Sequence, residues 1–364
     1  MTSAGKQRPP IAITVGDFNG IGPEVVLRSI SQPSVRSISA PLLVGPVSVF
    51  RYYARTLDIE LVFHPVQLSE LFEAPDWVTD ASVCAIPVLQ PSKTEPSVRP
   101  GTISSLAGKI SVKAVEQAVL LAQMGIVGAI VTAPVSKQAM HRAGIPYPGQ
   151  TELLQQLTSA PRVGMMLVSR TMRVGLVTIH VPIERVAATI TPTLLRDRIK
   201  VFYHALVSDW AINKPRVAVL GLNPHAGEGG DIGTEEKRIV TPVVNELRRA
   251  GLDVSGPFPA DAFFGRYKAG RYDAVIAMYH DQGLIPLKLS SFGKAVNVSV
   301  GLPVIRTSPG HGTGFDIAGK GIADPGSMIE AIKLARLILR NRSKVLAASV
   351  SSPELTPKER KHSP

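Results

Sequence analysis

Short apolar runs alternate with longer segments of helical periodicity along most of the chain. The helical segments begin near residues 23 and 104 or read TPTLLRDRIKVFYHALVSDWAI and TEEKRIVTPVVNELRRAG. The apolar runs read IAITVGD (from residue 11), APLLVG (40), GAIVTAPV (128), RVGLVTIH (173), PRVAVLGLN (215), DAVIAMYH (273) and KAVNVSVG (294). Because strands that are apolar throughout are buried on both faces, this alternation predicts an α/β fold with a mostly parallel sheet covered by helices.

The length of 364 residues exceeds what one hydrophobic core usually serves, which favours two domains or one large two-lobed domain. Hydrophobic residues make up 45% of the chain, as in an ordinary globular enzyme. From about residue 346 the chain reads LAASVSSPELTPKERKHSP, which is rich in Ser, Pro and Lys. This composition predicts a disordered tail over residues 346–364.

Charge and cysteine content narrow the class of protein. The formal net charge is +12, part of which belongs to the tail. Elsewhere no basic run is interleaved with aromatic residues, so we expect no nucleic-acid partner; a phosphorylated metabolite or a dinucleotide explains a basic enzyme at least as well. The single cysteine, Cys84, excludes an internal disulfide and is expected to be a small core residue. Without an apolar signal core or a membrane span, the protein is expected to be cytoplasmic.

Three histidines close three of the apolar runs. His180 ends VGLVTIH, His225 follows VAVLGLNP, and His280 ends AVIAMYH. Ligands bind at the carboxyl ends of parallel strands, and three neutral imidazoles there would leave coordination positions of a metal ion open for substrate. The alternative is that each histidine satisfies its own strand end. The shared topological position favours one divalent metal site.

Other polar residues gather around these strand ends. Asp281 adjoins His280 and Asp261 lies in GPFPADAFF, where either carboxylate could orient an imidazole, act as a base or cap a loop. Lys288, Asn297 and Arg306 together suit a phosphomonoester or a carboxylate, although either cation could equally be a surface charge.

A glycine-containing turn, TVGDFNGIGPEVV, joins the first strand-like run to a helix that begins near Pro23. Its backbone amides could bind a phosphate. The turn does not match GxGxxG, so a standard dinucleotide-binding turn is not supported, and close packing of strand against helix is the equal alternative.

Five longer motifs carry a resemblance to a known family. In chain order they read GDFNGIGPE, TAPVSKQAMHRAGIPYPGQTE, GLNPHAGEGGDIG, YHDQGLIPLK and GLPVIRTSPGHGTGFDIAGKGIADP. They resemble the 4-hydroxythreonine-4-phosphate dehydrogenase family of vitamin B6 biosynthesis, over about residues 10–335. Several long motifs in order are far more specific than any single short pattern.

The resemblance implies the architecture of the isocitrate and isopropylmalate dehydrogenases. Residues 1–135 and 302–345 would form a first lobe on the NAD side, and residues 136–301 a second lobe that carries the metal ligands. It also implies a homodimer with the site near the subunit interface, NAD or NADP as oxidant, and one divalent ion (Zn, Mg, Co or Mn) per site. The implied residues are His180, His225 and His280 for the metal, Gln150, Thr151, Lys288, Asn297 and Arg306 for the substrate, and His311, Gly312, Thr313 and Asp316 for the cofactor.

The reaction that the resemblance implies is oxidation of 4-phosphooxy-L-threonine to 2-amino-3-oxo-4-phosphooxybutanoate. This β-keto acid decarboxylates to 3-amino-2-oxopropyl phosphate on the route to pyridoxine 5'-phosphate. Asp261, Asp281 and Lys288 are the candidates for handling the proton, and the sequence does not rank them. A related activity on another four-carbon phosphorylated hydroxy acid, such as a phospho-threonate or phospho-erythronate, is the alternative.

Two departures from the family pattern bear on the substrate. The family usually has GDPAG where this chain has Gly16-Asp17-Phe18-Asn19-Gly20, and GHTE where it has Gly149-Gln150-Thr151-Glu152. Gln150 thus offers a neutral amide where a histidine could carry charge. Two other classes of protein are alternatives: a metallohydrolase, which would leave HGTGFDIAG without a purpose, and a basic binding protein, for which the tail is the sole positive feature.

Overall fold

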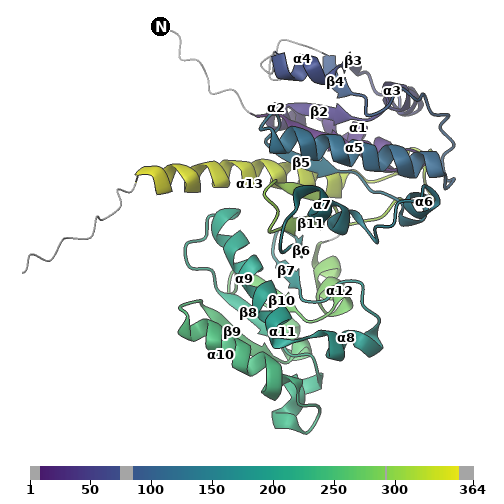
Figure 1. Ribbon diagram of the computed structural model, residues 1–364. Coiled ribbons are helices and arrows are strands. Elements are labelled where there is room, and N and C mark those ends of the chain that lie inside the picture. The colour runs from purple at the N-terminus through teal and green to yellow at the C-terminus, as the bar shows by residue number, and fades with distance from the viewer. Residues whose placement is uncertain (1–8, 74–84, 292, 352–364) are drawn as a thin grey trace, which may run out of the picture.

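The computed structural model describes residues 9–73, 85–291 and 293–351, so Cys84 and the end of the predicted tail lie outside the described residues. One sheet runs through the molecule (Figure 1). Its strands are β1 (Ile11–Thr14), β2 (Pro41–Val44), β3 (Val62–Val66), β4 (Ala85–Leu89), β5 (Ala129–Thr132), β6 (Gly164–Val168), β7 (Arg173–Leu176), β8 (Val217–Leu220), β9 (Val254–Phe258), β10 (Ala274–Ala277), β11 (Val296–Val300) and β12 (Arg306–Pro309).

Helices pack against the sheet on both sides of the strands. They are α1 (Gly22–Ile30), α2 (Pro33–Ser39), α3 (Val47–Thr56), α4 (Leu68–Glu73), α5 (Ser105–Gln123), α6 (Lys137–Arg142), α7 (Gln150–Thr158), α8 (Ile183–Thr189), α9 (Pro192–Ser208), α10 (Thr241–Arg249), α11 (Ala260–Gly265), α12 (His280–Ser291) and α13 (Gly326–Ser351). A 3-10 segment η2 (Pro224–Gly230) and a π-helical turn η3 (Glu236–Val240) follow β8. In the described residues, no helix is both long and apolar enough to cross a membrane.

The strand order is β3-β4-β2-β1-β5-β12-β11-β6-β7-β10-β8-β9. Eight of the eleven pairings between described strands are parallel, which confirms the predicted α/β class and the mostly parallel sheet. The central pairs β12–β11, β11–β6 and β6–β7 are antiparallel. A short turn between Ser169 and Met172 joins β6 to β7, and a turn this short can only return the chain antiparallel.

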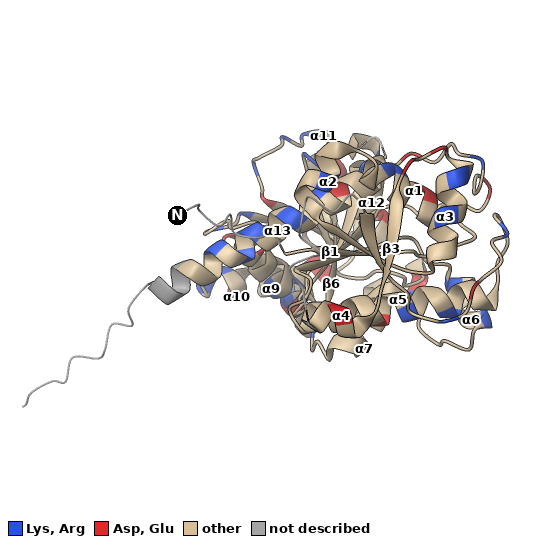
Figure 2. Ribbon diagram, turned by 90° about the horizontal axis from the view of Figure 1, so that it is seen from above, with Lys and Arg blue, Asp and Glu red and all other residues tan. Residues whose placement is uncertain are grey.

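The chain falls into two groups of strands along this sheet. Strands β1 to β5 and β12 form one end, and β6 to β11 form the other. Figure 1 shows α13 lying beside the first group, so the chain returns to its starting end after building the second. Lys and Arg are distributed over α13, α3 and α6 (Figure 2).

The helix α13 continues to Ser351, past residue 346, so the predicted start of the disordered tail is wrong. The segment that follows Leu346 opens with alanines, which are the best helix formers and extend an existing helix at little cost. The Ser/Pro-rich part that prompted the prediction lies largely beyond Ser351, outside the described residues.

The glycines of the turn after β1 allow close packing, which was one of the two roles predicted for them. A Cβ on Gly16 would lie 2.5 Å from the Pro134 carbonyl oxygen, and one on Gly20 would lie 2.6 Å from that of Thr313. Such distances are shorter than real contacts, so only glycine fits at these two positions.

The unusual pair Phe18-Asn19 has a packing role in this turn. Phe18 is buried in the core, and Asn19 Oδ1 accepts a hydrogen bond from the Arg99 backbone N–H at 2.8 Å. Asn19 Nδ2 donates to Thr102 Oγ1 at 3.2 Å. The departure from the family pattern therefore ties the turn to the loop before α5 and presents no side chain to the cavity described below.

Asp17, in the same turn, is a buried carboxylate that costs stability. Its Oδ1 accepts from the Asn19 backbone N–H at 3.0 Å, while its buried Oδ2 has no hydrogen-bond partner. Desolvation raises the pKa of Asp17 from 3.8 to about 6, against the opposing backbone hydrogen bonds. Because the folded state then binds a proton more tightly than the unfolded state, this cost is absent below about pH 4 and is complete above about pH 6.

Asp17→Asn should therefore raise the free energy of unfolding by about 1–3 kcal/mol at pH 8 and change it little at pH 4. Urea unfolding of both proteins at the two pH values measures the difference. An equal effect at both values would show that the carboxylate does not titrate in this window.

Candidate functional site

A cavity of about 200 Å³ opens between α6, α7 and the antiparallel centre of the sheet. Seven residues predicted from the sequence line it: Gln150, Thr151, His180, Asn297, Arg306, His311 and Gly312. They come from segments far apart in the chain, which the sheet brings together because β12, β11 and β6 are neighbours. The cavity therefore unites most of the predicted substrate set with one predicted metal ligand and part of the predicted cofactor set.

Arg306 is the buried cation of this cavity, with only 2% of its surface exposed. Its Nε and Nη2 donate to Thr132 Oγ1 at 3.0 and 2.7 Å, and its Nη1 donates to Ser299 Oγ at 3.0 Å. Burial lowers the pKa of Arg306 to about 10, with the charge of Glu152 opposing this shift, so the guanidinium stays charged at neutral pH. All its hydrogen-bond acceptors are neutral, and a buried cation held in this way is suited to an anionic ligand.

Gln150 holds Arg306 in place. Its Oε1 accepts from Arg306 Nη2 at 3.2 Å, and its Nε2 donates to the Ala133 carbonyl oxygen at 3.2 Å. The amide thus bridges β5 to the guanidinium. At this position a neutral acceptor does not neutralise the charge of Arg306, whereas a protonated histidine would repel it.

Two further polar atoms of the cavity wall are buried without a partner. They are Asn297 Oδ1 and His311 Nε2. His311 Nδ1 lies 3.0 Å from the Gly312 carbonyl oxygen, which makes Nδ1 the protonated nitrogen and leaves Nε2 as an acceptor. Buried polar atoms without partners are uncommon, and both of these are available to a ligand's donors.

His180 and His280 lie side by side, with ring centroids 6.0 Å apart. Desolvation and then the charge of Lys137 lower the pKa of His180, which Glu152 partly opposes. His280 Nδ1 lies 2.6 Å from Asp281 Oδ1, so the carboxylate orients the ring and leaves Nε2 free. A neutral imidazole and an oriented imidazole are both fit to bind a divalent ion.

His225 does not join this pair within one chain. Among the residues that the structure describes, no group of three or more His, Cys, Asp or Glu side chains could hold one metal ion. His225 is exposed in η2, where it, Ala226 and Glu228 all have positive φ values (52°, 52° and 42°). Such backbone is costly for residues other than glycine and is often found at functional sites.

Four other predicted residues lie outside the cavity lining. Lys288 is exposed on α12 and Asp261 is exposed on α11. Asp316 is also exposed, and the Thr313 carbonyl oxygen accepts from the Ile21 backbone N–H at 2.8 Å, which packs this segment onto the turn after β1. Only His311 and Gly312 of the predicted cofactor set reach the cavity.

Lys137 and Glu152 line the cavity but were not predicted as site residues. Lys137 begins α6 directly after Ser136, whose Oγ caps the helix by accepting from the Ala139 backbone N–H at 3.1 Å. Both residues lie in motifs that carried the family resemblance, and this was the signal available for them. With Arg306 and Lys137 against Glu152, the cavity has an excess of positive charge.

Comparison with known proteins shows that the chain is similar to a group of related dehydrogenases. The family model described as "Pyridoxal phosphate biosynthetic protein PdxA" matches residues 37–335. The chain is 40% identical over 338 residues to a 4-hydroxythreonine-4-phosphate dehydrogenase of Prosthecochloris aestuarii, covering 91% of this chain and 97% of the relative. It is 42% identical over 327 residues to a D-threonate 4-phosphate dehydrogenase of Cupriavidus necator, covering 89% and 96%.

Solved structures of such dehydrogenases have a fold similar to that of this chain. The crystal structure of a 4-hydroxythreonine-4-phosphate dehydrogenase from Burkholderia phymatum has a TM-score of 0.76 and 41% identity, covering 91% of this chain and 98% of that one. A terephthalate 1,2-cis-dihydrodiol dehydrogenase from Burkholderia xenovorans has a TM-score of 0.61 and 30% identity, covering 91% and 98%.

Proposed function

The chain belongs to the family described as pyridoxal phosphate biosynthetic protein PdxA, and we propose that it is an NAD-dependent dehydrogenase of 4-phosphooxy-L-threonine. The product would be 2-amino-3-oxo-4-phosphooxybutanoate, which loses carbon dioxide to give 3-amino-2-oxopropyl phosphate. The observation that carries the proposal is the buried Arg306, oriented to bind an anion, in one cavity of about 200 Å³ with His180, whose ring lies beside that of His280.

The phosphate would lie against Arg306. Its guanidinium is already oriented by three neutral side chains, so it loses little freedom when the ligand binds. Asn297 and Thr151 line the same cavity and would contact the remaining polar groups of the substrate. Lys137 adds a second positive charge for the phosphate or the carboxylate.

The metal site would form between two copies of the chain. His180 and His280 supply two imidazoles, and the exposed loop that carries His225 suits a third ligand delivered by a second copy. Large apolar side chains stand exposed on α8, which follows His180, and on α12, which begins at His280: Ile183 is 71%, Ile285 59% and Leu289 73% exposed. Such a surface favours a homodimer interface at α12, with the site near it.

The two cofactors supply the chemistry that side chains lack: a divalent ion (Zn, Mg, Co or Mn) is a Lewis acid, and NAD or NADP accepts a hydride. His311 and Gly312 would bind the nicotinamide cofactor at the cavity, while Thr313 and Asp316 continue along the same segment. The two lobes, residues 1–135 with 302–345 and residues 136–301, would then carry the cofactor and the metal ligands respectively.

The protein's own groups would position the reacting alcohol and handle its proton. Asp281 holds the His280 ring through the 2.6 Å contact. Asp261 and Lys288 are both exposed in the single chain, and as candidates for the proton they would act at a site completed by the second copy. Lys288 would also contribute to binding the substrate phosphate.

A second candidate substrate is D-threonate 4-phosphate, which differs by a hydroxyl in place of the amino group. One observation favours it: the relative from Cupriavidus necator, 42% identical to this chain, has this name. Both substrates share the phosphate, so the Arg306 site serves either.

The test is NADH formation by the purified protein with each substrate in the presence of a divalent ion. We expect the highest kcat/KM with 4-phosphooxy-L-threonine and at least about 100-fold less with the dephosphorylated compound, since the buried guanidinium is then left without its anion. Preference for D-threonate 4-phosphate would select the second candidate. No NADH from NAD and no NADPH from NADP with either substrate would overturn the dehydrogenase proposal.

A further inference from the structure

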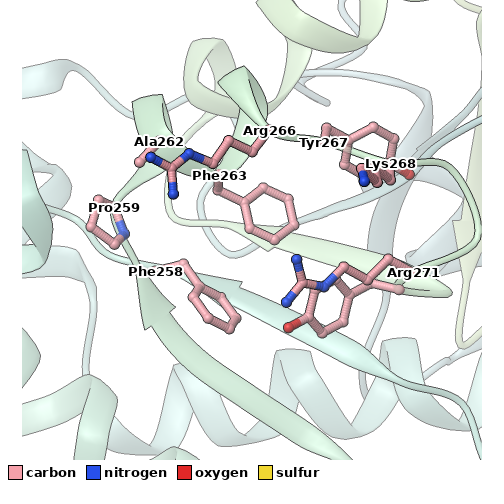
Figure 3. A pocket seen from close by; sticks show the side chains of 9 residues that line it. Phe258, Pro259, Ala262, Phe263, Arg266, Tyr267, Lys268 and Arg271 are labelled. Carbon is pink, nitrogen blue, oxygen red and sulfur yellow. The ribbon is translucent and has the colours of Figure 1, made fainter.

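A second cavity, of about 180 Å³, lies at the other end of the sheet from β3, beside the edge strand β9 and helix α11. Aromatic rings dominate its wall: Phe258, Phe263, Tyr267 and Tyr272 (Figure 3). None of its lining residues lines the cavity around Arg306. It is therefore a separate candidate site.

The rings form a tilted set centred on Phe263. Its centroid lies 5.6 Å from that of Phe258, 5.7 Å from that of Tyr272 and 6.0 Å from that of Tyr267. Tyr267 is fixed by its hydroxyl, which donates to the Thr171 carbonyl oxygen at 2.9 Å. All four rings are only partly buried, so their faces are accessible from the cavity.

Cations surround these rings. Arg266, Lys268 and Arg271 line the cavity, and none of its nine lining residues, all described in the structure, is acidic. The Arg271 guanidinium carbon lies 5.7 Å from the centre of the Tyr272 ring. Figure 3 shows the rings of Phe258 and Phe263 with the side chains of Arg266 and Arg271 on either side. Aromatic faces with a positive rim are complementary to a flat ring that carries an anionic group.

The volume restricts the size of the ligand. A cavity of about 150 Å³ lined by apolar side chains holds one benzene molecule. At about 180 Å³, this cavity holds one six-membered ring, with its charged substituent reaching the rim, and is too small for a dinucleotide.

We propose that this cavity binds a small planar aromatic or heteroaromatic anion, a single ring bearing a phosphate or a carboxylate. The ring would pack against the accessible faces of Phe258 and Phe263, and the anion would meet Arg266, Lys268 and Arg271. This cavity shares no lining residue with the cavity around Arg306, so its ligand is independent of the proposed reaction.

The test is isothermal titration calorimetry with phenyl phosphate and with benzoate. The ratio of their dissociation constants shows whether the cavity prefers a phosphate or a carboxylate. Cyclohexyl phosphate, which lacks the flat ring, and phenol, which lacks the charge, are the matched probes. We expect each to bind at least about 5-fold more weakly than phenyl phosphate, the effect of about 1 kcal/mol.

Variants locate the binding. Arg271→Gln and Phe263→Leu should each weaken the better-binding aromatic anion by about 5-fold or more, whereas Arg248→Gln, an exposed change on α10, should not. Arg271→Gln keeps every ring of the wall and so tests the site even if Phe263→Leu fails to fold. Binding should persist in Arg306→Met, whose first cavity lacks its cation. The proposal is overturned if neither anion binds, if Arg271→Gln leaves the affinity unchanged, or if Arg306→Met abolishes binding.

Discussion

Replacing Arg306 with methionine should lower kcat/KM for the phosphorylated substrate by about 30- to 5,000-fold, a loss of about 2–5 kcal/mol in transition-state stabilisation. Arg306 is 2% exposed and has only neutral acceptors, so no anion is hydrogen-bonded to its guanidinium until a ligand binds. Methionine fills similar space but offers no donor. Steady-state kinetics with substrates with and without the phosphate measures the loss.

The same variant should fold. It loses hydrogen bonds to Thr132, Ser299 and Gln150, but it also removes a buried cation that has no carboxylate partner, so we expect unfolding to change by less than about 2 kcal/mol. Inorganic phosphate should raise the Tm of the unmodified protein and not that of the variant.

Arg173→Met is the matched control. Arg173 is partly buried, burial lowers its pKa as it does that of Arg306, and its Nη1 donates to the Asp273 carbonyl oxygen at 3.1 Å, away from the cavity. This variant should lose stability while its kcat/KM and its response to phosphate stay within about twofold of the unmodified protein's. If both variants lost activity in proportion to stability, Arg306 would be a structural residue only.

The parallel part of the sheet could be predicted because burial on both faces leaves a continuous apolar run. β1 and β10 are of this kind, and each of their residues is buried. β12 could not be found in this way, because it reads Arg-Thr-Ser-Pro and is nevertheless buried. Arg306 and Ser308 line the cavity, and Thr307 Oγ1 donates to the Ala331 carbonyl oxygen in α13. These tertiary contacts stabilise a buried strand that the polar sequence does not indicate. β9 contains Gly and Pro and lies at the sheet edge, where both are tolerated.

The sequence predicted site residues that could be recognised by their residue type. It did not predict positions that depend on the conformation of a loop. Arg306, Asn297 and His180 are in the cavity as the sequence indicated. His180 and His280 lie side by side, as expected from their positions after the neighbouring strands β7 and β10, and their role as metal ligands stays a prediction. His225 does not lie with them in this chain, because η2 contains consecutive residues with left-handed backbone. No propensity rule predicts such a conformation. The role of Gln150 as a support for Arg306 could not be predicted either, because it depends on a hydrogen bond between residues 156 positions apart in the chain.

We expect three alanine variants to keep the fold but to lose at least about 1,000-fold in turnover and to bind less metal. They are His180→Ala, His225→Ala and His280→Ala. The reason is the same in each case: removing one of three imidazoles leaves too few ligands for a divalent ion. Metal content by atomic absorption and the Tm of each variant are the measurements that do not depend on activity. Alanine at His204, a histidine on α9 outside the cavity lining, is the matched control and should change neither.

Mixing two inactive variants then decides where the third ligand comes from. If His225 serves the site of the partner copy, a mixed dimer of His180→Ala and His225→Ala contains one site with all three histidines and one site with a single histidine. Random exchange of subunits should thus restore about a quarter of the unmodified activity and of the bound metal. If His225 served its own chain, every site in the mixture would lack one ligand and nothing would be restored. Leu289→Glu, which places a charge on the exposed apolar surface of α12, should prevent the rescue by separating the copies, and analytical ultracentrifugation would show the monomer. Full activity of the separated monomer would disprove the shared site.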